Sequence, residues 1–371
     1  RALVPKNWSS IDSSGCWRMA SSRKPRDSQL LTQFEPPRLL AAAIEGCLIS
    51  QPGIDRIAVG LSGGPDSAAL AICCAKLAKQ NHLDLYLFHV HHGLHPLADQ
   101  WMASAADLAQ HLGLTLTTQK VMVDLNSGLG IEAAARQARH AALREMSQAQ
   151  GIQALMMAHH MQDQAETVLL RLLRGAGVTG LGAMKSVTPQ GDVLLLRPWL
   201  AIERERILAC VAAYSALTGW QPVDDPSNRD EALGRGALRE RVIPALSGRW
   251  PNWHRTLSRH AQQAVEAEQL LTEFGQHLLQ TVVAPTVPGE KICAIDLLSW
   301  RGLSQAQQVL VLRTWLAQAG VLMPTQARLG DLMRQLRQLH ALGHDRALQW
   351  QHGASVIYCV RGRIELHAKV V

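Results

Sequence analysis

Short apolar runs alternate with longer segments of helical periodicity in the first half of the chain. The apolar runs predict buried strands at residues 56–61, 83–91, 114–121 and 153–158. The segments that follow them predict helices at residues 66–80, 97–112, 131–150 and 162–174. Buried strands that alternate with helices form a parallel sheet covered by helices on both faces. The pattern therefore predicts the α/β class, with a doubly wound parallel sheet.

The pattern changes near Ile202, where the strand signals stop. Helices are predicted at residues 204–218, 235–247, 252–282, 304–319 and 325–342, and a small antiparallel sheet or hairpin at 347–352, 355–360 and 363–366. A turn-rich stretch at residues 281–289 indicates a domain boundary. We expect four parts: a disordered or over-extended N-terminus (1–35), the sheet domain (36–200), a helical extension (201–283) and a small α+β domain (290–371).

The most informative stretch is Ser62-Gly63-Gly64-Pro65-Asp66-Ser67, which follows the first predicted strand and opens the next helix. A glycine-rich turn there presents free backbone N–H groups at the positive end of the helix dipole, which favours an anion such as phosphate. The turn lacks the lysine of the Walker pattern and the glycine spacing of the dinucleotide fingerprint. Its residues resemble S-G-G-x-D-S, the pyrophosphate loop (PP-loop) of the N-type ATP pyrophosphatases. A plain turn of small residues is the alternative.

This resemblance implies that ATP is cleaved between its α and β phosphates, so that AMP is transferred and pyrophosphate leaves. The implied ATP-binding residues are those of the loop, namely Ser62, Gly63, Gly64, Pro65, Asp66 and Ser67. Asp66 would also help to hold Mg²⁺, the implied metal cofactor.

Composition indicates the kind of partner and the cellular compartment of the protein. The formal net charge of +7 and the pI near 9.2 favour a polyanionic partner such as nucleic acid. No apolar stretch reaches the roughly 18–20 residues that a membrane helix needs. The seven cysteines include no C-x-x-C pair, which is typical of a reducing cytoplasm. We therefore expect a cytoplasmic protein with no membrane contact.

Two polar groups follow the loop. Histidines 89, 91, 92 and 95 lie at the end of the second predicted strand. Such a cluster could bind a metal, but no cysteine or carboxylate stands near it in the sequence, so we favour a wall of the nucleotide pocket. Glu132, Arg136 and Arg139 share one face of the next helix. That face is either solvated or, for Arg139, a contact to phosphate.

The third group is His159-His160-Met161-Gln162-Asp163-Gln164-Ala165-Glu166-Thr167, which spans the end of the fourth predicted strand and the start of a helix. Asp163 and Glu166 in a first helical turn can simply cap free N–H groups. The carboxyl ends of parallel strands meet at one edge of a sheet, where ligands bind. Beside the PP-loop, His159, Asp163 and Glu166 are therefore active-site candidates.

Taken in order, these groups resemble bacterial tRNA(Ile)-lysidine synthetases over roughly residues 35–250, and more loosely to about 366. The loop alone is typical of the whole superfamily. The His159–Thr167 block and Asp224-Asp225-Pro226-Ser227-Asn228 are more specific. The resemblance implies adenylation of the C2 carbonyl oxygen of cytidine 34 in the CAU anticodon of an isoleucine tRNA. Free L-lysine then displaces AMP; ATP and Mg²⁺ are the implied cofactors, and a homodimer is compatible with the resemblance.

The resemblance also implies roles for single residues. Arg139 and His159 would stabilise charge on the α-phosphate. Asp66 and Asp163 would place Mg²⁺ or the incoming lysine, and Glu166 would orient the helix or the amine. For tRNA contact we expect four arginines, namely Arg171, Arg174, Arg249 and Arg255. Trp250 and Trp253 lie between the last two, and either stack on bases or anchor helix packing.

The chain departs from the family at Arg235-Gly236-Ala237, where an Arg-Asn pair is common, and this puts contacts to tRNA or between domains in doubt there. We also expect it to lack the second C-terminal domain of longer members. Rival functions are a tRNA thiolation enzyme, a ligase of the GMP or NAD synthetase type, and a non-catalytic RNA-binding protein. The missing C-x-x-C pair argues against the first, the Asp224–Asn228 motif against the second, and the intact PP-loop against the third.

Overall fold

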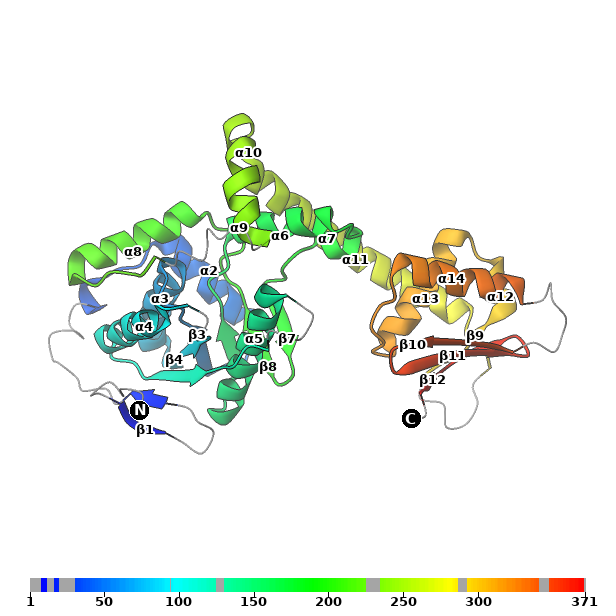
Figure 1. The fold of residues 1–371 in the computed structure, drawn as a ribbon, viewed down its shortest axis with the longest axis horizontal. Coiled ribbons are helices and arrows are strands. Elements are labelled where there is room, and N and C mark those ends of the chain that lie inside the picture. The colour runs from blue at the N-terminus through cyan, green and yellow to red at the C-terminus, as the bar shows by residue number, and fades with distance from the viewer. Residues whose placement is uncertain are drawn as a thin grey trace. The chain divides into compact units, whose positions relative to one another are not determined.

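The computed structural model describes residues 8–11, 17–19, 31–93, 95–124, 130–224, 234–285, 292–339 and 347–369. Residues 225–228 of the Asp224–Asn228 motif and residues 286–289 of the turn-rich stretch lie outside this set. The chain forms two compact units, residues 1–263 and 264–371 (Figure 1). The division falls inside helix α11 (Trp253–Thr281), because Leu278 and Leu279 near its end belong to the second core.

The first unit is built on an eight-stranded sheet with the order β1-β2-β5-β4-β3-β6-β8-β7. Its strands are β1 (Trp8–Ile11), β2 (Trp17–Met19), β3 (Arg56–Gly60), β4 (Asp84–His91), β5 (Leu116–Lys120), β6 (Ala154–Met156), β7 (Val187–Gln190) and β8 (Val193–Leu196). Strands β5, β4, β3, β6 and β8 are parallel to one another, whereas β7 and β2 pair antiparallel at either end of this group. The predicted α/β class and its parallel sheet are confirmed.

Helices cover both faces of this sheet because successive side chains of each strand point to opposite faces. Ile57 and Val59 of β3 pack in a core with α2 (Arg38–Ile49), α3 (Pro65–Asn81), α4 (Ala98–Leu112) and α8 (Arg204–Thr218). Ala58, between them in the sequence, packs in a second core with α5 (Ile131–Ala149).

The N-terminal segment and the β7–β8 hairpin contain strands that the apolar pattern did not indicate. The described part of residues 1–35, which we expected to be disordered or over-extended, contains β1 and β2, and its Leu31 and Phe34 are buried in the core. The hairpin was not predicted because Pro189 lies in β7, and proline is tolerated in a sheet only at an edge. Strand β7 is an edge strand.

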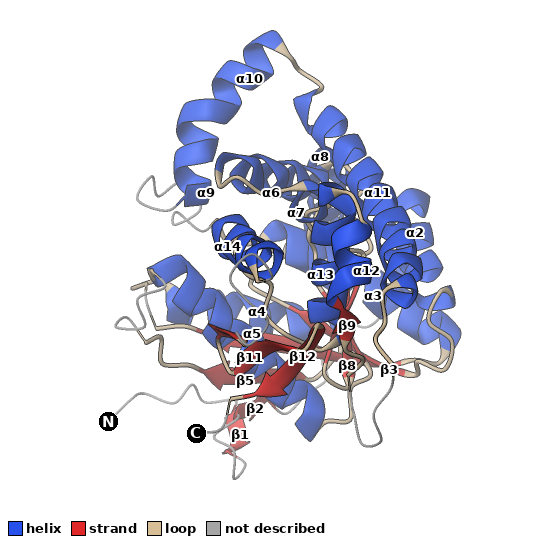
Figure 2. Ribbon diagram, turned by 90° about the vertical axis from the view of Figure 1, so that its right-hand side faces the viewer, coloured by secondary structure: helices blue, strands red, loops and turns tan. Residues whose placement is uncertain are grey.

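Between β8 and β9 the described chain is helical (Figure 2). Besides α8, this region contains α9 (Gly234–Ala237), the π-helix η2 (Leu238–Val242), α10 (Ile243–Arg249) and the start of α11. Helix α10 projects away from the sheet of its own unit in both views. Two further helices, α6 (Met161–Leu173) and α7 (Val178–Leu181), follow β6. No helix of the described residues is long and apolar enough to cross a membrane.

The second unit is a small α+β domain, as predicted. Its antiparallel sheet has the order β10-β11-β12-β9, formed by β9 (Ile295–Asp296), β10 (Leu348–His352), β11 (Ser355–Val360) and β12 (Arg363–Ala368). Its helices are α12 (Leu297–Gly302), α13 (Gln305–Gln318) and α14 (Gln326–Gln338). Trp300 and Trp315 are fully buried in its core.

Candidate active site

The loop between β3 and α3 is shaped by Gly63. Its φ is +91°, and a Cβ atom there would lie 3.0 Å from the carbonyl oxygen of Trp101 and 3.1 Å from Cγ2 of Val223. The position therefore requires glycine both for its conformation and for space. Pro65 takes the first position of α3, where a missing N–H costs nothing. The loop thus brings backbone N–H groups to the start of a helix, an arrangement that binds phosphate.

Gly63→Ala is expected to weaken ATP binding by roughly tenfold or more, because strain of about 1–3 kcal/mol would move the loop backbone. Equilibrium binding of ATP and thermal unfolding measure the two effects. Gly64→Ala is the matched control for stability, since Gly64 has a φ of −75° and a Cβ there would meet Ser62 Oγ only at 3.5 Å. Equal losses of stability in the two variants would contradict this account of the loop.

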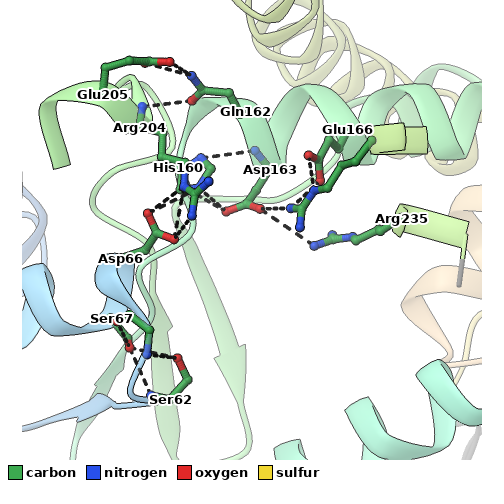
Figure 3. A network of polar contacts seen from close by, with 12 residues as sticks. Ser62, Asp66, Ser67, His160, Gln162, Asp163, Glu166, Arg204, Glu205 and Arg235 are labelled. Carbon is green, nitrogen blue, oxygen red and sulfur yellow. Dashed lines mark hydrogen bonds and ion pairs between the residues drawn. The ribbon is translucent and has the colours of Figure 1, made fainter. Parts of the chain in front are cut away.

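Two serine hydroxyls hold the loop from inside. The Oγ atoms of Ser62 and Ser67 are 2.9 Å apart, and Ser67 Oγ donates to the carbonyl oxygen of Gly64 at 3.1 Å. The backbone N–H groups of Ser62 and Gly64 donate in turn to Ser67 Oγ and Ser62 Oγ. These bonds join the two serine side chains to each other and to the loop backbone (Figure 3).

Two histidines of β4 make side-chain hydrogen bonds beside the loop. The Nδ1 atom of His89 hydrogen-bonds the carbonyl oxygen of Leu61 at 2.8 Å, and Nε2 of His91 hydrogen-bonds Asp99 at 2.9 Å. Burial lowers the pKa of His89 to about 4, so its imidazole is neutral at pH 7.

His89→Gln is expected to make the protein less sensitive to acid. An unfolded histidine titrates near pH 6.5, whereas the pKa of folded His89 is about 4, so acid favours the unfolded chain. The stabilising contribution is complete above pH 6.5 and is lost as the pH falls toward 4. Between pH 7 and pH 5 the wild type should therefore lose about 2 kcal/mol more unfolding free energy than the variant. Urea unfolding at both pH values measures this; equal losses would mean that His89 is not held neutral.

Asp66, in the first turn of α3, is bound by an arginine from a distant helix. Arg204 opens α8, and its Nε donates to both oxygens of Asp66 at 3.1 and 3.3 Å while its Nη2 donates to Oδ2 at 3.1 Å. Gln162 fixes the start of α8, because its Oε1 accepts from the backbone N–H of Arg204 at 3.0 Å and its amide donates to Glu205 (Figure 3).

Helix α6 begins with a reciprocal cap between His160 and Asp163. The backbone N–H of His160 donates to Asp163 Oδ2 at 3.1 Å, and the backbone N–H of Asp163 donates to Nδ1 of His160 at 3.4 Å. Because Nδ1 accepts, the ring proton lies on Nε2, which is 3.3 Å from Asp163 Oδ2 and 3.8 Å from Asp66 Oδ1. His160 therefore links the two aspartates, and the cap role that we considered for Asp163 is confirmed.

Glu166 is not a cap but half of a buried ion pair. Arg239 in the π-helix η2 donates from Nε to Oε1 of Glu166 at 2.7 Å and from Nη2 to Oε2 at 2.9 Å. The same Nη2 lies 3.5 Å from Asp163 Oδ1, and Arg235 lies 4.0 Å from that oxygen. Burial raises the pKa of Asp163, but His160, His159 and Arg235 outweigh it, and the net pKa is lowered. Asp163 is therefore ionised.

A second group at the same sheet edge combines three arginines with three histidines. It comprises His92 after β4, Arg136, Arg139 and His140 in α5, His159 after β6 and Arg197 after β8. The Nε atoms of Arg139 and Arg197 and the Nδ1 atoms of His92 and His159 are buried without a hydrogen-bond partner among the described residues. We call this set the cationic group.

The electrostatics of the cationic group favour a bound anion. Burial, and after it the neighbouring arginines, lowers the pKa of Arg139 and of Arg197 to about 10. Burial also lowers the pKa of His159 to about 3, so this ring is neutral and acts as a hydrogen-bonding group. Buried guanidinium groups without a carboxylate are unfavourable unless an anion joins them. A phosphate, which matches the guanidinium fork, would do so.

Comparison with known proteins assigns this arrangement to a family. Residues 41–246 match the family model described as PP-loop domain, and residues 296–365 match that described as TilS substrate binding domain. The tRNA(Ile)-lysidine synthase of Bordetella parapertussis is 46% identical over 327 residues, which cover 88% of this chain and 93% of that protein. This chain belongs to the tRNA(Ile)-lysidine synthase family.

Two further similar proteins are more distant. The tRNA(Ile)-lysidine synthase of Ralstonia nicotianae is 39% identical over 316 residues, which cover 85% of this chain and 65% of that protein. Among solved structures, the U34-tRNA thiolase NcsA from Methanococcus maripaludis matches with a TM-score of 0.49 at 16% identity, covering 61% of this chain and 78% of that one. This structural similarity is too low to support a functional argument.

The active-site residues expected for a tRNA(Ile)-lysidine synthase lie at one edge of the sheet. Asp66 follows β3 with the rest of the loop, Asp163 and Glu166 begin α6 after β6, and Arg139 and His159 belong to the cationic group. The structure thus brings together residues that we selected from separate segments of the chain.

The four arginines expected to contact tRNA are arranged differently. Arg171 Nη1 donates to the carbonyl oxygen of Gly180 at 2.7 Å, and Arg255 Nε donates to Glu203 at 2.5 Å, so both hold local structure. Arg174 and Arg249 are exposed. The contact of all four arginines with tRNA stays a prediction.

Sequence reasoning missed the partners of the carboxylates, namely His160, Arg204, Arg235 and Arg239, and it also missed Arg197. Arg204 lies 138 residues after Asp66, and Arg239 lies 73 residues after Glu166. The signal that could have indicated these partners was the balance of charge, since carboxylates buried at a sheet edge require cations nearby.

The lysidine synthase site, as arranged here, does not leave Asp66 free to ligate Mg²⁺. Both of its oxygens already accept hydrogen bonds from Arg204. Asp163 and Glu166 also face guanidinium groups, those of Arg235 and Arg239. Mg²⁺ requires oxygen ligands in near-octahedral geometry. The predicted role of Asp66 as a metal ligand therefore needs a rearrangement of Arg204.

Proposed function

We propose that this protein ligates free L-lysine to C2 of cytidine 34 in the CAU anticodon of an isoleucine tRNA, with ATP cleaved to AMP and pyrophosphate. The observation that carries the proposal is the sheet edge where the PP-loop, the carboxylates of α6 and the cationic group meet, in a chain 46% identical to a tRNA(Ile)-lysidine synthase. The homodimer that the resemblance allows stays a prediction.

The first step activates the cytosine base. Its C2 carbonyl oxygen attacks the α-phosphorus of ATP, the bond between the α-phosphorus and the bridging oxygen breaks, and pyrophosphate leaves. The place of the glycine-rich loop at the start of α3 supports a role in binding the leaving pyrophosphate. Arg139, His159 and Arg197 would surround the α-phosphate, where charge builds up in the transition state. Mg²⁺, when bound with ATP, would neutralise part of the phosphate charge.

The second step forms the C–N bond. The ε-amine of lysine attacks C2, AMP leaves with the former carbonyl oxygen, and the amine loses its protons. Asp163 and Glu166 are buried and face the same edge of the sheet, so they are suited to hold the lysine ammonium and to accept a proton from it. A lysine ammonium bound there would share the carboxylates of Asp163 and Glu166 with Arg239.

A tRNA contact is supported by the exposed end of α10. Trp250 is 60% exposed, and the guanidinium of Arg249 lies 6.0 Å from its ring centroid. Trp253 is buried and donates to Ser247 Oγ at 3.1 Å, so it anchors the packing of this segment. Trp250 offers a face on which an RNA base can stack, and Arg249 can bind a phosphate.

The test is direct attachment of lysine. The protein is incubated with ATP, Mg²⁺, radiolabelled lysine and the isoleucine tRNA with a CAU anticodon. Label is expected on this tRNA and on none of the elongator methionine tRNA with the same anticodon. Failure to label the isoleucine tRNA would reject the proposal.

A further inference from the structure

Arg204 binds the aspartate of the PP-loop from outside the loop. It comes from α8, outside the PP-loop, and its guanidinium occupies both oxygens of the residue expected to hold the metal. Around it, Asp66, Asp163 and Glu166 are matched by Arg204, Arg235 and Arg239, and His160 bridges the two aspartates. The carboxylate side of the site is therefore neutral as it stands.

With no net charge, the carboxylate side offers a free divalent cation no net attraction. A cation that approaches Asp66 meets the charge of Arg204 on the same oxygens, and the charges of Arg235 and Arg239 lie on the next carboxylates. Guanidinium thus excludes Mg²⁺ from Asp66 as long as the ion pair persists.

Arg204 is the more exposed partner of its ion pair with Asp66. The backbone of Arg204 is fixed by Gln162, but 44% of its side chain is exposed, whereas the side chain of Asp66 is only 24% exposed. Asp66 belongs to the first turn of α3, the same turn whose N–H groups face the phosphate position. Rotation about the side-chain bonds of Arg204 can therefore release Asp66 without moving α8.

We propose that Arg204 exchanges partners: it holds Asp66 in the ATP-free protein and binds the pyrophosphate portion of ATP when the loop is filled, which frees Asp66 for Mg²⁺. This inference rests on the proposed function only in assuming that ATP occupies the loop. A guanidinium fork matches two phosphate oxygens, so the move replaces one bidentate ion pair by another. Mg²⁺ then enters with ATP and not before it.

The test uses the ATP-free protein and needs neither tRNA nor lysine. Mn²⁺ serves as the probe for Mg²⁺, and its binding is measured by electron paramagnetic resonance on wild type, Arg204→Gln and the control Arg206→Gln. Arg206 is an exposed residue of the same helix, and its replacement removes the same charge. Arg204→Gln is expected to bind Mn²⁺ roughly tenfold more tightly than the other two, because an uncompensated Asp66 is left. Adding Asp66→Asn to Arg204→Gln should abolish this gain.

The second measurement is the affinity for pyrophosphate, titrated without metal in the presence of a chelator. Arg204→Gln should bind pyrophosphate roughly tenfold more weakly than wild type and Arg206→Gln, since one charged hydrogen-bonding partner is lost. Thermal unfolding verifies that the variants are folded. Arg204→Lys keeps the charge without the fork, and it should still exclude Mn²⁺.

An unchanged affinity of Arg204→Gln for either Mn²⁺ or pyrophosphate would overturn the exchange and leave Arg204 as a structural ion pair. Both measurements are independent of lysine attachment. A wild-type protein that fails to attach lysine but passes both tests would reject the proposed reaction and keep the role of Arg204.

Discussion

Arg239→Ala is expected to lower the unfolding free energy by about 3 kcal/mol and to reduce lysine attachment at least a hundredfold. The side chain of Glu166 is only 4% exposed, and Arg239 binds both of its oxygens. Removing the guanidinium leaves a buried carboxylate without a counter-charge, and it also releases Asp163. Urea unfolding and the lysine attachment assay measure the two losses.

The double variant Arg239→Ala, Glu166→Gln separates these causes. A neutral amide at position 166 requires no counter-charge, so the double variant should recover most of the lost stability. It should remain inactive, because the carboxylate that would hold the lysine ammonium is gone. A single variant Arg239→Ala that unfolds like wild type would show that the ion pair contributes no net stability.

The fold followed from periodicity wherever an element was long and uniform. Helix α8 has the predicted bounds, Arg204–Thr218. The helix predicted at 235–247 is present as α9, the π-helix η2 and α10, which follow one another without a gap from Gly234 to Arg249. Pro244 accounts for the π segment, because proline lacks an N–H and its ring clashes with the preceding turn of an α-helix. The π turn η2 lies directly before Pro244, and its i→i+5 hydrogen-bond pattern accommodates the proline; Arg239 lies in this turn.

Of the residues around Asp66, only the PP-loop and the carboxylates of α6 could be predicted from the sequence. Glycine, serine and aspartate in the PP-loop have local signatures, since turn geometry and helix capping require those residue types at fixed spacing. The arginines have no such signature. Arg204 is one of many surface-compatible arginines until the fold places it against Asp66, which lies on a different helix. Long-range pairing of charges is a property of the fold and not of local sequence.

Arg139→Met is expected to have the opposite effect on stability from Arg239→Ala. Arg139 faces Arg136 and Arg235, and its Nε has no hydrogen-bond partner in the described part of the chain. Methionine keeps much of the apolar stem and removes a partly buried charge that no carboxylate balances. The unfolding free energy should therefore stay at the wild-type value or rise by up to about 1 kcal/mol.

The same substitution should lower the rate of the adenylation step by about 10²–10³, because a preorganised cation at the α-phosphate acts mainly in the transition state. Single-turnover release of pyrophosphate from ATP, with saturating isoleucine tRNA, measures this rate. Arg144→Met is the control, since Arg144 is an exposed residue of the same helix.

A destabilised Arg139→Met would mean that its charge is balanced within the protein, and the cationic group would then not be an anion site. A stable and fully active Arg139→Met would remove this arginine from the reaction. The expected combination, a stable fold with a slow first step, arises only if the missing counter-charge of Arg139 is the phosphate of the substrate.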